Sequence, residues 1–256
     1  MNSAAVKAVI TGGVSGLGFA VAQRLVADGG RVALFDVDVD KADAAVSGLG
    51  GSAARFFKVD VTSEPAVTEA IAAAADWLGG LNVAVNCAGI LGAGRVLGRD
   101  GPMPLERFST TVMVNLVGSF NVAKAAAESM QHNDPGEDGE RGVIINTASI
   151  AAFEGQIGQA AYSASKGGVV GMTLPLAREF ARIGVRVMTI APGVFHTPMV
   201  DIMPEQVQQA LGESIPFPKR LGRGEEFADL AAHIVANRYY NGSVVRLDGA
   251  VRLEPK

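Results

Sequence analysis

The sequence has a single cysteine, Cys87, among its 256 residues. One cysteine cannot form an intramolecular disulfide, which favours a protein of a reducing compartment. No apolar run reaches the length needed to cross a membrane without an interrupting glycine, proline or charge. We also expect no signal or transit peptide, because strand-like residues begin by Ala5. We therefore expect a cytoplasmic protein that does not associate with membranes.

An excess of positive charge is absent as well. Lys and Arg total 22 against 26 Asp and Glu, a formal net charge of -4, whereas general nucleic-acid binders are usually basic. Nucleic acid is therefore disfavoured as a partner. The three histidines, His132, His196 and His233, have no Cys or His partner at the spacing of a metal site. We expect no bound metal.

Apolar residues are plentiful and occur in short blocks. Hydrophobic residues make up 48% and charged residues 19%, which excludes disorder and predicts a well-filled interior. The predicted buried strands lie at residues 5–11, 31–35, 54–59, 82–85, 142–145, 185–190 and 243–247. Helical segments between them are typical of a parallel sheet covered on both faces. We predict one α/β domain over residues 1–256, a Rossmann-type doubly wound sheet of about seven strands.

A glycine-rich turn follows the first predicted strand and precedes the helical residues 19–27. It contains Gly12, Ser15, Gly16, Leu17 and Gly18. Glycines let a backbone approach a pyrophosphate closely, and a helix N-terminus supplies free N–H groups and a favourable dipole. A glycine cluster alone is a weak signal in a chain with 32 glycines. Its position directly after the first strand predicts a dinucleotide site.

Acidic residues end the second and third predicted strands. Asp36 stands where a carboxylate hydrogen-bonds the adenine ribose, about 20 positions beyond the glycine turn. It would repel a 2′-phosphate, and neither Ser15 nor Val37 offers a cation, so we predict NAD rather than NADP. The alternative for Asp36 is a solvated strand-end carboxylate. Asp60 could accept an adenine amino hydrogen while Val61 packs on the ring, or it could serve a plain turn.

Small residues follow the fourth predicted strand. The segment N-C-A-G at residues 86–89 suits a backbone that passes close to a flat ligand. Cys87 fits a small buried residue better than a nucleophile, because no local basic residue would lower its pKa. Residues 92–104 are glycine-rich and contain Arg95, Arg99 and Asp100, which predicts a loop insertion.

Three side chains in residues 146–168 suggest acid/base chemistry. Ser149 follows the predicted strand 142–145, while Tyr162 and Lys166 stand four apart in a segment of helical composition. Lowering a phenol pKa from about 10 by about three units takes roughly 4 kcal/mol. An ammonium about 4 Å away supplies roughly that at an effective dielectric near 20. Tyr162 is thus predicted to exchange protons while Ser149 binds the substrate oxygen, although such Tyr–Lys pairs are common in helices.

A long helix is predicted over residues 105–130, and one stripe of it faces the core. The stripe consists of Phe108, Val112, Asn115, Ser119, Val122 and Ala126. A buried amide must be satisfied, either by a backbone carbonyl or by a water that relays protons to Lys166. A purely structural Asn115 is the alternative.

A second irregular region follows the predicted strand 185–190. Residues 194–224 contain several prolines and are predicted to be a substrate lid at the carboxyl end of the sheet. Lys219, Arg220 and Arg223 give the region positive charge, which is either a solvated loop or a contact for substrate phosphates.

Taken together, these motifs resemble the short-chain dehydrogenase/reductase family over essentially the whole chain. They are T-G-G-V-S-G-L-G at residues 11–18, N-C-A-G at 86–89, Asn115, Ser149, Y-S-A-S-K at 162–166 and Pro192-Gly193. Residues 142–174, 187–193, 216–222 and 246–250 are similar almost residue for residue to a subgroup that acts on 3-hydroxyacyl-CoA. Residues 92–104 differ from that subgroup in detail.

The resemblance implies a role for each matching residue. Tyr162 would be the acid/base, Lys166 would lower its pKa and hold the nicotinamide ribose, and Asn115 would support a proton relay. The implied NAD contacts are Gly12, Ser15, Gly16, Leu17, Gly18, Asp36, Asp60, Val61, Cys87, Ala88, Gly89, Tyr162, Lys166, Pro192, Phe195 and Thr197. The implied substrate contacts are Ser149, Gln156, Gln159 and Tyr162.

By the same resemblance, the expected reaction is NAD-dependent interconversion of 3-hydroxyacyl-CoA and 3-ketoacyl-CoA by a homotetramer. One alternative is an NAD-dependent dehydrogenase of hydroxysteroids or other secondary alcohols. Another is an NAD-binding scaffold without chemistry, which would have no need of Asn115, Ser149, Tyr162 and Lys166 together.

Overall fold

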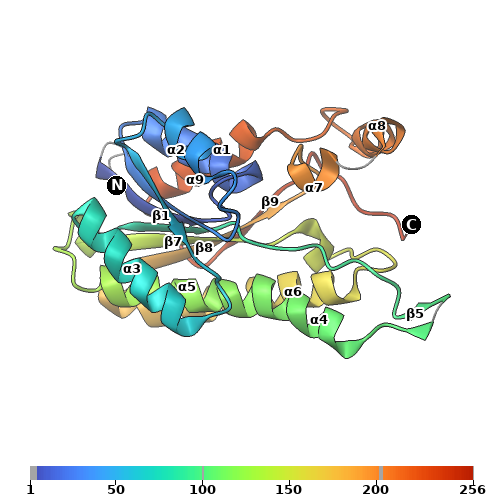
Figure 1. The fold of residues 1–256 in the computed structure, drawn as a ribbon, viewed down its shortest axis with the longest axis horizontal. Helices are drawn as coiled ribbons and strands as arrows, with labels where there is room; N and C mark the ends of the chain where they lie inside the picture. The colour runs from blue at the N-terminus through green and yellow to red at the C-terminus, as the bar shows by residue number, and fades with distance from the viewer. Residues whose placement is uncertain (1–4, 100, 202–203, 256) are drawn as a thin grey trace.

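The computed structural model describes residues 5–99, 101–201 and 204–255 of the chain. A seven-stranded sheet forms its centre, with strand order β3-β2-β1-β4-β7-β8-β9 and parallel neighbours throughout (Figure 1). The strands are β1 (Lys7–Thr11), β2 (Arg31–Asp36), β3 (Ala54–Lys58), β4 (Val83–Asn86), β7 (Gly142–Thr147), β8 (Val185–Pro192) and β9 (Val244–Leu247). The predicted fold class is confirmed, with strand ends within about two residues of those expected.

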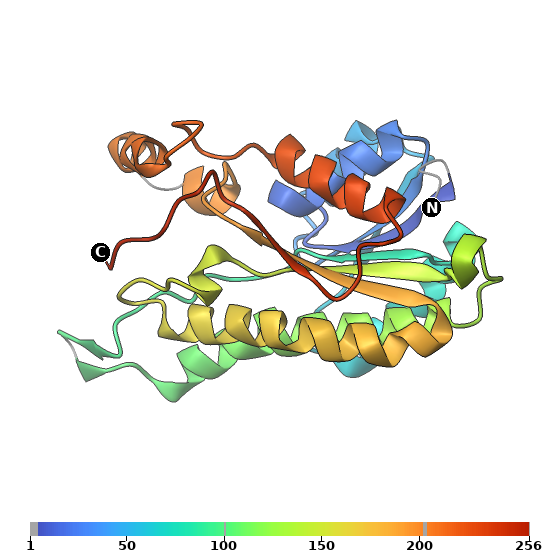
Figure 2. The same ribbon diagram turned by 180° about the vertical axis from the view of Figure 1, so that it is seen from behind.

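Helices cover both faces of the sheet, as Figures 1 and 2 show. One layer consists of α1 (Gly16–Ala27), α2 (Ala42–Gly48) and α9 (Gly224–Ala236), and the other of α3 (Glu64–Leu78), α5 (Gly118–Met130) and α6 (Ala160–Phe180). Successive strand residues point to opposite layers. In β1, Ala8 and Ile10 join the core under α1 and α9, whereas Val9 joins the core over α3 and α5. Among the described residues, no helix is long and apolar enough to span a bilayer.

The strand register aligns the carboxyl ends of the central strands. Thr11 pairs with Asn86, Asn86 with Asn146, and Asn146 with Thr189. The segments that leave these four strands therefore emerge along one edge of the sheet. This edge is where ligands of open parallel sheets bind.

The predicted helix at 105–130 is one continuous helical segment with a change of pitch. α4 (Leu105–Val112) passes into the π-helix η2 (Met113–Val117) and then into α5. The wider π-turn changes the helix phase, and α4 packs on α6 instead of on the sheet. Phe108 was therefore placed wrongly on the core-facing stripe, since it is 36% exposed.

The two predicted loops contain regular structure. The 92–104 insertion folds into an antiparallel pair, β5 (Leu97–Gly98) and β6 (Gly101–Pro102), while Asp100 lies outside the described residues. The expectation that 194–224 is wholly irregular is wrong, because α7 (Pro198–Asp201) and α8 (Glu205–Ser214) lie within it. Their prolines occur at helix starts, where no helical hydrogen bond is lost. Ile202 and Met203 of the predicted lid lie outside the described residues. Single 3-10 turns complete the fold at η3 (Glu137–Gly139), η4 (Ile150–Ala152) and η5 (Ala181–Ile183).

Candidate active site

A cavity of about 800 Å³ lies at the carboxyl edge of the sheet. Its volume is within the range of small-molecule sites. Every residue predicted to contact cofactor or substrate lines it: Gly12, Ser15, Gly16, Leu17, Gly18, Asp36, Asp60, Val61, Cys87, Ala88, Gly89, Ser149, Gln156, Gln159, Tyr162, Lys166, Pro192, Phe195 and Thr197. Asn115 is fully buried and is not part of the lining. The fold thus brings the separate motifs into one space.

The glycine turn is shaped so that a side chain would obstruct it. Gly12 has a left-handed φ of +63°, and a Cβ there would lie 3.0 Å from the Ala88 nitrogen. A Cβ on Gly18 would come within 2.3 Å of the Gly12 carbonyl oxygen. Ser15 begins α1 in an extended conformation and lines the cavity beside Gly16. The first-turn N–H groups of α1, which have no partner within the helix, are therefore available to an anion in the cavity.

Asp36 ends β2 on the cavity wall and is held by backbone N–H groups. Its Oδ1 accepts hydrogen bonds from Val37 (2.8 Å) and Asp38 (3.1 Å). The charge of Lys41 interacts with Asp36, but its Nζ forms an ion pair with Asp38 at 2.6 Å. That ion pair raises the pKa of Lys41 and lowers the pKa of Asp38. Lys41, whose charge reaches Asp36, is therefore engaged by a second carboxylate.

Asp60 forms the strand-end turn that was its alternative role. Its Oδ1 accepts hydrogen bonds from the backbone N–H of Thr62 (2.9 Å) and from the Thr62 hydroxyl (2.7 Å). Val61 is buried and lines the cavity, and its carbonyl accepts a bond from Asn121 Nδ2. Asp60 is exposed on the same cavity wall, so the turn leaves it able to meet a ligand.

Cys87 is not a candidate nucleophile. Burial raises the pKa of its thiol to about 11, opposed in part by a hydrogen bond with the Thr147 hydroxyl and by the charge of Lys166. Thr11 Oγ1 accepts bonds from the N–H groups of Cys87 and Ala88, both at 3.1 Å. This hydroxyl fixes the path of the backbone after β4 next to the glycine turn.

Ser149 and Tyr162 both line the cavity and contact each other. Ser149 caps the 3-10 turn η4, where its Oγ accepts a bond from the Ala151 N–H at 3.1 Å. Burial raises the pKa of Tyr162, and a hydrogen bond with the Ser149 side chain opposes part of that rise. The pair places a hydroxyl donor and a phenol beside the same space.

Lys166 lies one helical turn beyond Tyr162 and is buried. Its Nζ donates a hydrogen bond to the Thr147 carbonyl at 2.7 Å and lies 5.8 Å from the centre of the Tyr162 ring. Burial lowers the pKa of Lys166 to about 8, an effect partly opposed by the Cys87 thiol. That Lys166 lowers the phenol pKa stays a prediction, because burial is the largest influence on the pKa of Tyr162 and the contact that opposes it is the one with Ser149.

Asn115 bridges the helix to the chain after β4. Its amide accepts a bond from the Ile90 N–H (2.8 Å) and donates one to the Ile90 carbonyl (2.9 Å). The amide also donates to Ser165 Oγ at 3.0 Å, next to Lys166 in α6. A Cβ on Gly89 would lie 3.1 Å from the Asn115 Oδ1 and 3.5 Å from the Lys166 Nζ. The Ile90 carbonyl is thus the backbone partner expected for this amide, and the proton relay stays a prediction.

The far end of the cavity is apolar, and its wall was not predicted from the sequence. Val200, Val207, Leu211 and Leu253 come from α7, α8 and the end of the chain. Gln156 and Gln159 lie at its polar margin and contact each other, with the Gln156 N–H donating to Gln159 Oε1 at 3.0 Å. The spacing of Val207 and Leu211, four apart, is a helical signal that the proline density of the region obscured.

One of the three predicted lid cations, Arg220, is engaged in an ion pair. Arg220 forms a bidentate pair with Glu226, at 2.9 and 2.7 Å, and this pair lowers the pKa of Glu226 to about 2. Arg223 is the N-cap of α9, and its backbone N–H donates to Glu226. Lys219 is exposed and does not line the cavity.

Comparison with known proteins identifies the class of protein. A sequence profile described as short chain dehydrogenase matches residues 6–208. The chain therefore belongs to the short-chain dehydrogenase family, whose members are oxidoreductases that use NAD or NADP. The glycine turn, the α1 N-terminus and Asp36 fit such a dinucleotide in one cavity. Within the described residues, no group of three or more His, Cys, Asp or Glu is placed to hold a metal ion.

Relatives with one particular name are similar over nearly the full length. Human "3-hydroxyacyl-CoA dehydrogenase type-2" is 52% identical over 250 residues, covering 97% of this chain and 95% of the human one. The protein of that name from Drosophila melanogaster is 49% identical over 249 residues, covering 96% and 97%. The crystal structure of 3-hydroxyacyl-CoA dehydrogenase type-2 from Mycobacterium avium matches with a TM-score of 0.93 at 46% identity, covering 98% and 97%.

Proposed function

We propose that this chain catalyses the reversible NAD-dependent interconversion of 3-hydroxyacyl-CoA and 3-ketoacyl-CoA. The observation that carries the proposal is the cavity itself, which joins Ser149, Tyr162 and Lys166 to an apolar wall at Leu211 and Leu253. The name shared by relatives about half identical to this chain supports the same substrate class.

The proposed chemistry assigns one proton task to each polar residue. Ser149 hydrogen-bonds the substrate oxygen, and Tyr162 takes the hydroxyl proton during oxidation or returns it during reduction. A bound nicotinamide would supply the hydride chemistry, taking hydride from the carbinol carbon in oxidation and returning it to the carbonyl carbon in reduction. Lys166 would stabilise the phenolate with its charge and would hold the nicotinamide ribose. Asn115 acts as a positioning residue, because its bonds reach Ile90 and Ser165 rather than the cavity.

NAD is the proposed cofactor in preference to NADP. The Asp36 carboxylate lies on the cavity wall with its charge only partly neutralised by N–H groups. A 2′-phosphate there would meet like charge, and Lys41 is already paired with Asp38.

A direct test is NADH oxidation by the purified protein with acetoacetyl-CoA, run beside NADPH and beside a steroid ketone with NADH. We expect turnover with NADH and the CoA ester. The matched variant Tyr162→Phe should lose turnover by roughly 100-fold or more while binding NADH as the parent does. Substantial activity in the folded variant contradicts the role of Tyr162.

A hydroxysteroid or other secondary alcohol is the second candidate substrate, favoured by the aliphatic wall of Val200, Val207 and Leu211. A neutral steroid would need no phosphate contact, so added salt should not weaken its binding. An inert CoA ester together with a reactive steroid ketone would favour this candidate.

We also propose a homotetramer. Leu105, Met113, Val117 and Phe120 are exposed along α4, η2 and α5. Contiguous apolar surface of this kind commonly marks a subunit interface. Light scattering on the parent and on Phe120→Lys tests the proposal, and a monomeric parent protein contradicts it.

A further inference from the structure

The chain after β9 crosses the loop that begins at Ser149. Gln156 Nε2 donates a hydrogen bond to the Glu254 carbonyl, and the Ile157 N–H donates to the Pro255 carbonyl, both at 3.0 Å. We call residues 249–255 the tail. It lies against residues 150–157, the segment that carries the substrate-side wall of the cavity.

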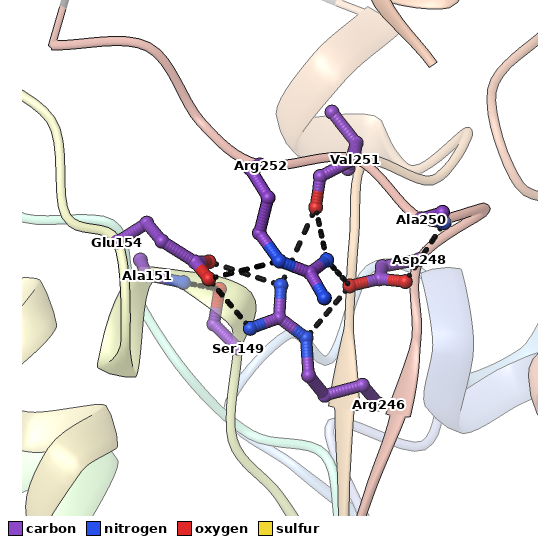
Figure 3. A network of polar contacts seen from close by, with 8 residues as sticks. All are labelled: Ser149, Ala151, Glu154, Arg246, Asp248, Ala250, Val251 and Arg252. Carbon is purple, nitrogen blue, oxygen red and sulfur yellow. Dashed lines mark hydrogen bonds and ion pairs between the residues drawn. The ribbon is translucent and has the colours of Figure 1, made fainter. Parts of the chain in front are cut away.

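A cluster of four charged side chains holds this arrangement in place (Figure 3). Arg246 of β9 makes a bidentate pair with Glu154, at 2.7 and 3.0 Å, and its Nε bonds Asp248 Oδ2 at 2.8 Å. Arg252 of the tail contacts the same two carboxylates, at 3.4 Å from Glu154 and 3.1 Å from Asp248. Two cations and two anions give no net formal charge, so the cluster is internally compensated.

The bidentate geometry distinguishes this cluster from an ordinary surface ion pair. Only 9% of the Asp248 side chain and 23% of the Arg246 side chain are exposed to solvent. The Arg246 guanidinium lies 5.1 Å from the centre of the Phe153 ring. A planar fork on a carboxylate fixes both distance and orientation, which a lysine ammonium does not. Arg246 also donates a hydrogen bond to the Val251 carbonyl at 3.3 Å, so it binds both the loop that carries Glu154 and the tail.

Apolar contacts connect the tail to the lid helices. Val251 is 3% exposed and packs in a cluster with Ile150, Ile215 and Leu221, against which Leu211 and Leu253 also pack. Leu253 is half-buried and lines the cavity. The tail therefore contacts both the segment that follows Ser149 and the segment 211–221 near α8.

We propose that the tail is a substrate-selecting wall, in which Leu253 limits the acyl chain and Arg246 is the positioning residue that sets where Leu253 stands. The inference rests on the proposed acyl-CoA function. Leu253 touches the space where an acyl chain lies, whereas Arg246 acts through Glu154 and Val251 and reaches no substrate. A change at either residue should alter which chain lengths fit, without altering the proton chemistry at Tyr162.

The test compares kcat/KM along a series of 3-ketoacyl-CoA esters of increasing chain length, starting at acetoacetyl-CoA. Leu253→Ala should raise the ratio of long-chain to short-chain kcat/KM by roughly tenfold, and Leu253→Phe should lower it by roughly tenfold. Opposite shifts from opposite changes in volume are not expected of a residue that only stabilises the fold.

The substitution Arg246→Lys keeps the positive charge but removes the bidentate guanidinium contact with Glu154. We expect KM to rise by roughly fivefold for the preferred chain length and by less for the others, so that the chain-length preference flattens, with kcat for acetoacetyl-CoA kept within about twofold. Arg238→Lys is the matched control, because Arg238 also contacts two carboxylates, Glu137 and Asp138, but lies outside the cavity lining. It should leave the chain-length profile unchanged.

Methyl esters of the same 3-ketoacids, assayed in parallel, separate the two proposals. A parent enzyme that reduces the methyl esters and not the CoA esters overturns the acyl-CoA function, and the methyl-ester profile then still reports on the tail. Parental chain-length profiles in both Leu253 variants and in Arg246→Lys, with either series, overturn the inference about the tail.

Discussion

The ammonium of Lys166 and the main-chain carbonyl of Thr147 are joined by a 2.7 Å hydrogen bond, so a side chain of α6 is tied to the last residue of β7. The bond places the charge at the carboxyl edge of the sheet, where the cavity lies. It also keeps Lys166 out of solvent, which lowers its pKa to about 8. The ammonium is therefore held at the cavity, where a ligand binds. Burying its charge lowers the stability of the folded protein by an amount that depends on pH.

That cost predicts a pH-dependent difference in stability between the parent protein and Lys166→Met. The pKa of about 8 in the folded protein lies below the ordinary lysine pKa of 10.5, so the unfolded chain binds more protons between these limits. The loss of stability from the buried charge is complete below pH 8 and disappears as pH rises towards 10.5. The parent should gain roughly 3 kcal/mol relative to the variant across that window. Urea unfolding at both ends of the window measures it, and a constant difference would contradict the buried charge.

The Ser149–Tyr162 contact predicts a shift in the pH profile of alcohol oxidation. The hydrogen bond from Ser149 opposes the rise that burial causes in the Tyr162 pKa. Removing it in Ser149→Ala should raise that pKa further, so the alkaline rise in kcat/KM should move to higher pH. Turnover should also fall by roughly 100-fold, because the substrate oxygen loses a donor. An unchanged profile would show that the two side chains act independently.

Cofactor choice is predicted to depend on the charge of Asp36. Asp36→Asn keeps an acceptor for the Val37 and Asp38 N–H groups but removes the repulsion of a 2′-phosphate. The ratio of kcat/KM for NADPH over NADH should rise by roughly tenfold or more. Asp43→Asn, exposed on α2, is the charge-matched control and should leave the ratio as it is.

Gly18 offers a test of the glycine turn. A Cβ there would lie 2.3 Å from the Gly12 carbonyl oxygen, and neither backbone can move freely. Gly18→Ala should therefore lose more than about 1 kcal/mol of stability and weaken NADH binding. Gly48→Ala is the control, since its Cβ would meet only Phe19 Cζ at 3.7 Å, and alanine in a helix is expected to be neutral or stabilising. Calorimetry and NADH titration distinguish the two.

Much of this site could be predicted from the sequence because its residues follow strand ends. A parallel sheet brings such residues to one edge whatever the loops do, and every predicted cofactor or substrate contact lines the cavity. Asn115 shows the limit of the approach. The core-facing stripe of the predicted helix indicated that Asn115 is buried. Its partner, Ile90, depends on a π-turn that no local pattern indicates.

Ion pairs between residues far apart in the sequence could not be predicted either. Arg220 looked like a free cation because Glu226 is six residues away, across the start of a helix. Glu154 and Arg246 are 92 residues apart, and only the folded chain places them together. Prolines at helix starts likewise hid α7 and α8, which carry three of the four side chains of the apolar wall.

The amide bridge from Asn115 to Ile90 gives the molecule a side chain that takes the place of a neighbouring strand. β4 ends at Asn86, yet four residues later the backbone N–H and carbonyl of Ile90 are both paired, as they would be in a sheet. The Ile90 amide proton should consequently exchange with solvent deuterium far more slowly than its position outside any strand or helix suggests. In Asn115→Ala it should exchange as fast as an open loop, while the amides of β4 keep their protection.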